Sequence, residues 1–137
     1  MFTRRSRARE VALQLLFQRD QNPTPVERAA VVKFVRDRLL EDDDLAAFCL
    51  SLVDGVTEKQ AEIDQRISAA AENWRIGRML PADRNVLRLG TYELTVAGTP
   101  REVAIDEAIE LARRFGSKDS ASFVNGVLDK VAQSKDA

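Results

Sequence analysis

The chain has 137 residues, of which 45% are hydrophobic and 31% are charged, and its formal net charge is −1. These values are typical of one globular domain, and they exclude a disordered chain or a whole-molecule attraction to nucleic acid. Histidine is absent and Cys49 is the only cysteine, which excludes Ser-His and Cys-His catalytic pairs, an internal disulfide and a CxxC zinc site. No apolar run approaches the roughly 18 residues of a membrane span, and we read no signal peptide, so the expected compartment is a reducing cytoplasm.

A hydrophobic period of about 3.6 residues runs through almost every segment, and no segment shows sustained alternation, so the sequence predicts an all-α bundle of about six helices. The first helix is expected over residues 5–19, with Ala8, Val11, Ala12, Leu15 and Leu16 as its apolar stripe. The second is expected to start at Thr24-Pro25, with Thr24 as the N-cap, and to run to about residue 40.

A run of three aspartates, Asp42, Asp43 and Asp44, precedes the expected third helix, at about 44–72. Three carboxylates can bind a metal, but a capped, dipole-satisfying helix start is the favoured interpretation. Cys49 lies on the apolar stripe of this helix, which favours a buried, inert thiol over a reactive one.

The second half of the chain continues the helical pattern. We expect a connector over 73–80 with Trp74 and Gly77, a central and most buried helix from Pro81 to about Ala97, a fifth helix from near Thr99-Pro100, and a last helix over 118–132. Gly116 is expected to form a left-handed cap between the last two helices, and Ser117 to cap the last one. The tail from Gln133 is expected to fray.

Two phenylalanines do not fit the expected core. Phe115 stands at a helix end beside Arg113 and Arg114, and Phe123 lies about 100° from the apolar stripe of the last helix. An off-stripe ring usually packs in a second layer, but two rings close to Lys118 also suit single-stranded RNA, whose bases stack on aromatic faces while cations track its backbone. Ser117, Asp119 and Asn125 are candidates for hydrogen bonds to base edges.

The N-terminal stretch TRRSRAR carries Arg4, Arg5, Arg7 and Arg9. Arginines at a helix start oppose the helix dipole, so a phosphate-binding patch is one interpretation and a solvated, disordered basic leader is the other. Enzymatic motifs such as a Gly-rich phosphate loop, GxSxG or HExxH are missing from the sequence. Acidic residues 106, 107 and 110 are interpreted as the exposed face of a helix rather than as metal ligands.

Three stretches together resemble one known family. VAIDEAIELARRFGSKDSASFVNGVLDKVA, residues 103–132, closely resembles the C-terminal signature of the NusB family of bacterial transcription antitermination factors, with Asp106 where the family usually has asparagine. RSRAREVALQLLF, residues 5–17, resembles its N-terminal pattern, with Ser6 where the family often has arginine. VLRLGTYEL, residues 86–94, is similar to its central motif, whereas residues 20–80 match only in hydrophobic pattern.

The resemblance implies an all-helical fold of six to seven helices in two small packed halves, about 1–80 and about 81–137. It implies a non-enzymatic protein without cofactor that binds the boxA element of ribosomal RNA leaders together with the ribosomal protein NusE, and through it RNA polymerase and the other Nus factors. The residues that the resemblance assigns to RNA binding are Arg4, Arg5, Arg7, Arg9, Phe115, Ser117, Lys118, Asp119 and Phe123. Those assigned to the protein partner are Phe17 and Asp83.

Two other functions remain open at the level of the sequence. One is an RNA-binding domain of a ribosomal RNA cytosine methyltransferase, which shares the fold, although the chain has no nucleotide-binding glycine motif. The other is a purely protein-binding helical adaptor, for which the basic N-terminus would be incidental. The oligomeric state is left open between a monomer and a homodimer.

Overall fold

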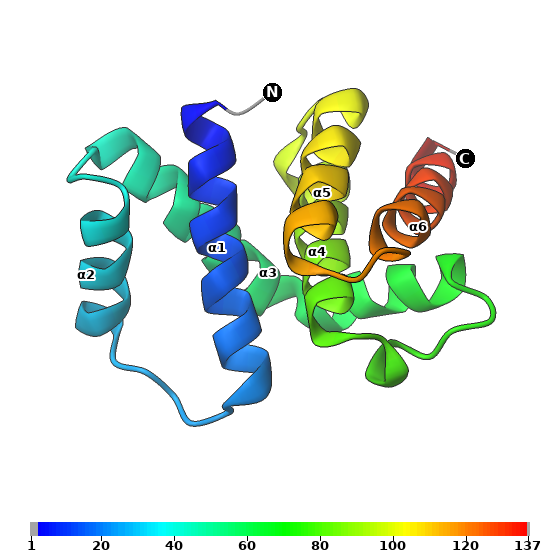
Figure 1. Ribbon diagram of the computed structural model, residues 1–137, viewed down its shortest axis with the longest axis horizontal. Coiled ribbons are helices and arrows are strands. Elements are labelled where there is room, and N and C mark those ends of the chain that lie inside the picture. The colour runs from blue at the N-terminus through cyan, green and yellow to red at the C-terminus, as the bar shows by residue number, and fades with distance from the viewer. Residues whose placement is uncertain (1–2, 137) are drawn as a thin grey trace. The chain divides into compact units, whose positions relative to one another are not determined.

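The computed structural model describes residues 3–136, which form six α-helices and no strand (Figure 1). The helices are α1 (Arg4–Gln21), α2 (Arg28–Arg38), α3 (Asp43–Ala70), α4 (Pro81–Tyr92), α5 (Arg101–Phe115) and α6 (Ser120–Asp136), with a 3₁₀ helix at Ile76–Arg78 and a π-helical turn at Glu93–Ala97. The predicted all-α class is confirmed. None of the described helices is long and apolar enough to cross a membrane.

The chain divides into two compact units, Met1–Gly55 and Val56–Ala137. The division falls within α3, whereas the sequence predicted one near residue 80. The first unit therefore holds α1, α2 and the start of α3, and the second holds the rest of α3 with α4, α5 and α6.

In the first unit, a reciprocal cap fixes the start of α1. The Ser6 N–H donates to Thr3 Oγ1 at 3.0 Å, and the Thr3 N–H donates to Ser6 Oγ at 3.1 Å. Ser6, which stands where the resembling family often has arginine, is therefore a buried capping residue. The predicted stripe of α1 is buried at Ala8, Val11, Ala12 and Leu16, but Leu15 is only half-buried and Leu13 is buried instead.

The predicted start of the second helix at Thr24 is wrong, because α2 begins at Arg28. The Thr24 N–H donates to Asn22 Oδ1 at 3.3 Å, and the backbone is still extended at Glu27, with ψ of 139°. Residues 21–30 are all exposed, so a helical turn at Thr24 would bury no apolar side chain. Because a first turn is costly to form without packing, the helix begins nearer to its apolar residues.

A capped start of α3 is confirmed at the run of aspartates. Asp42 Oδ1 accepts a hydrogen bond from the Leu45 N–H at 3.0 Å, and Asp43 and Asp44 lie in the first turn. Among the side chains that the structure describes, those of residues 3–134, no group of three or more acidic or cysteine side chains is placed to hold a metal ion.

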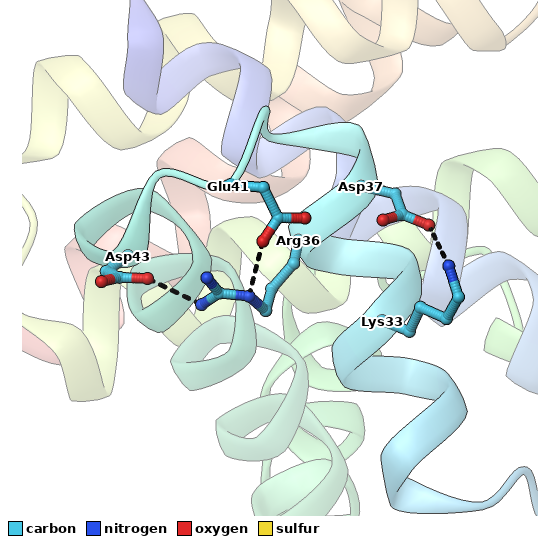
Figure 2. A network of polar contacts seen from close by, with 5 residues as sticks. All are labelled: Lys33, Arg36, Asp37, Glu41 and Asp43. Atoms are coloured by element: carbon cyan, nitrogen blue, oxygen red, sulfur yellow. Dashed lines mark hydrogen bonds and ion pairs between the residues drawn. The ribbon is translucent and has the colours of Figure 1, made fainter.

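The turn before α3 has a left-handed backbone at two residues that are not glycine, with φ of 55° at Leu40 and 60° at Glu41. Arg36 spans this turn: its Nε donates to Glu41 at 2.9 Å and its terminal nitrogen donates to Asp43 at 2.7 Å (Figure 2). The hydrogen bond and charge of Asp43, followed by those of Glu41, raise the pKa of Arg36. Arg36 of α2 therefore holds both Glu41, within the strained turn, and Asp43, the first residue of α3.

Cys49 is fully buried in α3, as its place on the apolar stripe predicted. Burial, and secondarily the charge of Asp54, raise the pKa of the Cys49 thiol to about 12. The thiol is therefore protonated and shielded at neutral pH, which confirms the interpretation of an inert cysteine.

In the second unit, α4, α5 and α6 pack on one another, and α4 is the most buried of the three, as predicted. A Cβ at Gly90 of α4 would lie 2.8 Å from Leu128 Cδ1 of α6, so the glycine allows these helices to approach closely. Arg88 extends from α4 to α3, where its Nε and terminal nitrogen donate to the two carboxylate oxygens of Asp64 at 2.9 and 3.1 Å. Gly98 ends the helical segment in a left-handed conformation, with φ of 74°.

Candidate nucleic-acid interface

The turn between α5 and α6 is set by steric contact rather than by a left-handed cap. The predicted left-handed cap at Gly116 is wrong, because φ is −98° and ψ is −163°, an extended conformation open to any residue. A Cβ at position 116 would instead lie 2.3 Å from Ser120 Oγ and 2.8 Å from the Ala112 carbonyl oxygen. Gly116 is therefore needed because α6 starts almost in contact with the end of α5.

The start of α6 also differs from the prediction. The helix begins at Ser120 rather than 118, and Ser117 lies in the preceding turn, where its Oγ accepts from the Asp119 N–H at a long 3.4 Å. Ser120 Oγ accepts a hydrogen bond of 2.8 Å from the Ser117 N–H, and the Asp119 carbonyl accepts one from the Phe123 N–H at 3.1 Å. The helix continues to Asp136, beyond its predicted end, and Ala137 lies outside the described residues.

This turn exposes an aromatic ring next to cations. Phe115 is 39% exposed at the end of α5, with the Arg114 guanidinium carbon 5.1 Å from its ring centre. Ser117, Lys118 and Asp119 are all exposed. The Lys118 ammonium has no carboxylate partner among the described side chains, those of residues 3–134, so its charge is available to a ligand.

Phe123 lies off the buried stripe of α6, as the helical period predicted. Ser120, Val124, Val127, Leu128 and Val131 are buried, whereas Phe123 is half-buried. Its ring contacts that of Trp74 in an edge-to-face arrangement, with ring centres 5.7 Å apart and an interplanar angle of 70°. Phe123 thus has a packing role and an accessible surface at once, and Trp74, which the sequence placed only in a connector, becomes its neighbour.

The N-terminal arginines belong to the first unit, and each of them interacts with other side chains there. Arg4 pairs with Asp42, and Arg7 pairs with Glu10 at 3.0 Å. The guanidinium carbons of Arg5 and Arg9 lie 4.2 and 5.2 Å from the centre of the Phe48 ring.

Because α1 already begins at Arg4, the alternative of a disordered basic leader is wrong. Arg4, Arg5 and Arg7 are exposed, but Arg9 is only 4% exposed and so offers little surface to a ligand. Phe48 was not predicted to take part, because its place on the apolar stripe of α3 gives no sign that two arginines lie against its ring.

The two residues predicted to contact a protein partner differ in accessibility. Phe17 on α1 is 42% exposed, an unusual position for a large apolar ring. Asp83 in the first turn of α4 is only 7% exposed, and its Oδ1 is buried without a hydrogen-bond partner.

Comparisons with known proteins match one family over nearly the whole chain. The pattern of the NusB family matches residues 6–133. The chain is 50% identical over 129 residues to the transcription antitermination protein NusB of Solibacter usitatus, covering 93% of this chain and 87% of that protein.

Solved structures show the same fold. NusB from T. maritima superposes with a TM-score of 0.84 at 37% identity, covering 97% of this chain and 93% of that one. A crystal structure of the antitermination factors NusB and NusE in complex with double-stranded RNA superposes with a TM-score of 0.85 at 24% identity, covering 98% of this chain and 99% of that chain, a likeness that concerns the fold alone. These relatives are named as antitermination factors rather than enzymes, in agreement with the predicted non-enzymatic role. The family pattern and the identity to antitermination proteins show that this chain belongs to the NusB family.

Proposed function

We propose that the protein binds the boxA element of ribosomal RNA leaders as a single strand, together with the ribosomal protein NusE, and acts through NusE on RNA polymerase with the other Nus factors. The observation that carries the RNA-binding part is the α5–α6 turn, where the exposed ring of Phe115 stands three residues from the unpaired ammonium of Lys118. Exposed aromatic faces beside cations are the arrangement that holds unpaired bases and their phosphates.

Each residue of the turn has a role that its surroundings support. Phe115 and Phe123 stack on bases, and Lys118 pairs with a phosphate. The exposed side chains of Ser117 and Asp119 hydrogen-bond to base edges, the hydroxyl as donor or acceptor and the carboxylate as acceptor. Ser117 Oγ makes two long contacts, at 3.3 Å with Ser120 Oγ and at 3.4 Å with the Asp119 N–H, so this hydroxyl can exchange a partner for a base.

The exposed arginines of α1 bind further phosphates. The Arg4 side chain is largely exposed, and an ion pair such as Arg4–Asp42 contributes only about 0–1 kcal/mol, so it opens at little cost. Arg7 pairs with the buried Glu10, but its own guanidinium is exposed and can be shared with a phosphate. A guanidinium–phosphate pair with two parallel hydrogen bonds is stronger. Arg9, nearly buried over Phe48, supports the segment and does not reach the strand directly.

The partner surface includes the exposed ring of Phe17, since exposed aromatic rings are enriched where proteins bind each other. Asp83 has little exposed surface, and its acidic side chain in the first turn of α4 is favoured there by the helix dipole. A homodimer is the alternative assembly, and sedimentation analysis with and without NusE distinguishes it from a one-to-one complex.

Fluorescence anisotropy with a short boxA-like single-stranded RNA tests the two rings. Phe115→Ala and Phe123→Ala should each weaken binding by roughly 5- to 150-fold, because each stacked base contributes about 1–3 kcal/mol. Phe34→Ala is the matched control, since Phe34 is a half-buried ring with the Arg38 guanidinium 4.7 Å from its centre, outside the proposed site. Equal affinities for all three variants, with unchanged circular dichroism, would remove the aromatic part of the proposal.

The salt dependence of the same binding tests the arginines. The slope of log affinity against log salt should lose about 0.7 for each phosphate contact removed, so Arg5→Ala and Arg7→Ala should each flatten it. Lys33→Ala, which removes an exposed cation paired with Asp37 on α2, should leave the slope unchanged. A purely protein-binding adaptor predicts that the arginine variants behave as the Lys33 variant does.

A further inference from the structure

Trp74 is the one tryptophan of the chain, and it is 58% exposed. It lies in the connector between α3 and α4, within the second unit. A side chain of this size is usually well buried, because it removes more apolar surface from water than almost any other. Its contact with Phe123 leaves most of the indole open to solvent, next to a ring already proposed to hold RNA.

Trp74 lines three open hollows, and two of them bear on its role. One has a volume of about 250 Å³ and is lined by Trp74, Phe123, Gly126 and Lys130, among others. The other, of about 450 Å³, is lined by Asn73, Trp74, Arg75 and Arg78. The smaller volume is below the roughly 300–1,000 Å³ of sites for drug-sized ligands, so it suits a single flat ring system.

The cations around Trp74 are not neutralised internally. Arg75 and Arg78 are exposed, and neither guanidinium has a carboxylate partner among the side chains of residues 3–134. Lys130 is likewise exposed and unpaired in this part of the chain. Glu72 and Lys130 both line the smaller hollow, whereas the lining of the larger one holds Arg75 and Arg78 and no acid. The surroundings of the indole therefore favour an anionic ligand.

We propose that Trp74 forms a second base-stacking site, in which one unpaired RNA nucleotide places its base on the indole and its phosphate on Arg75 and Arg78. An exposed indole with adjacent guanidinium groups offers both contacts that a nucleotide of a single strand requires. The contact between the Trp74 and Phe123 rings makes this site continuous with the α5–α6 turn, so the same strand passes over both. The inference rests on the proposed RNA-binding function and extends its surface to the α3–α4 connector.

The fluorescence of the single tryptophan reports on the site directly. Titration with the boxA-like RNA should quench Trp74 emission along the same saturation curve that anisotropy gives. Binding by anisotropy without quenching would overturn the Trp74 site and leave the proposed function standing. No binding by either measurement would overturn both.

Substitutions separate stacking from packing against Phe123. Trp74→Ala should weaken RNA binding by roughly 5- to 150-fold, whereas Trp74→Phe, which keeps an aromatic face, should stay within a few-fold of the original protein. Gly126→Glu leaves both rings in place, because nothing lies within 4 Å of a Cβ there, and adds a carboxylate to the smaller hollow. It should also weaken binding, and unchanged affinity in both Trp74→Ala and Gly126→Glu would refute the site.

The phosphate contacts are tested by charge. Arg75→Ala and Arg78→Ala should each flatten the log–log salt dependence by about 0.7. Lys59→Ala removes an equally exposed and unpaired cation from α3, away from both hollows, and should leave the slope unchanged. An equal change in all three variants would mean that the arginines act only through overall charge.

Discussion

The substitution Gly116→Ala tests the steric origin of the α5–α6 turn. The added Cβ would lie 2.3 Å from Ser120 Oγ, 2.5 Å from Ser120 Cβ and 2.8 Å from the Ala112 carbonyl oxygen. With φ of −98°, the backbone itself is acceptable to alanine, so any loss of stability must come from these contacts. Ser120 is 1% exposed, which prevents its side chain from turning away.

The size of the loss follows from three effects. Overpacking at a closely packed position costs about 1–3 kcal/mol. A shift of Ser120 also weakens its 2.8 Å hydrogen bond from Ser117, which contributes about 1 kcal/mol. Alanine also lowers the entropy of the unfolded chain, which stabilises the folded protein by about 0.4–1 kcal/mol. The net destabilisation should be about 2 kcal/mol, or about 7 °C in Tm for 137 residues.

Thermal and urea unfolding, followed by circular dichroism, measure this loss. Gly126→Ala is the matched control, because it makes the same change within α6 where a Cβ meets nothing within 4 Å. It should stabilise the protein by about 0.8–1 kcal/mol through helix propensity. Adding Ser120→Gly to Gly116→Ala removes two of the three short contacts, so the double variant should lose less than the sum of the single losses. If Gly116→Ala is as stable as the original protein, the steric argument is refuted.

Three further predictions concern other parts of the chain. Leu40→Gly should stabilise by roughly 0.5 kcal/mol in thermal unfolding, because it relieves a left-handed residue whose side chain is 89% exposed, whereas Leu40→Ala should not. Arg88→Ala should lower the free energy of unfolding in urea by about 3 kcal/mol, because the Asp64 carboxylate loses both of its hydrogen bonds from the Arg88 guanidinium. A loss below about 1 kcal/mol would contradict this. The raised pKa of Cys49 means that the unfolded thiol ionises first, so stability should fall above about pH 8.5 by up to about 1.4 kcal/mol per pH unit, and Cys49→Ala should remove this slope.

The sequence predicted helix bounds best where a long apolar stripe is also buried in the structure. The third, fourth and fifth helices were predicted within a few residues of α3, α4 with its π-helical turn, and α5, because their stripes at residues such as Leu52, Leu87 and Ala108 are all buried. The start of α2 was wrong because the Thr24-Pro25 signal is local, whereas burial of apolar side chains decided where that helix begins.

At the candidate site, the residue types were readable from the sequence but their surroundings were not. The off-stripe place of Phe123 followed from helical period alone. Two contacts join residues that are distant along the chain: Arg9 lies nearly buried against Phe48, and Trp74 contacts Phe123. No local sequence pattern predicts such contacts. The reason for Gly116 was likewise misread, since a glycine required by φ and one required by a neighbouring helix look the same in sequence.

The amino-acid sequence by itself determined the all-α class, the family and the buried, inert character of Cys49, because periodicity, motif and apolar surroundings are all properties of neighbouring residues. Only the tertiary structure decided which arginines stay exposed and that an exposed tryptophan lies beside Phe123. It also decided that the chain between α1 and α2 is not helical before Arg28. These features depend on contacts between helices, and the free energy of such contacts is set by which side chains meet across space.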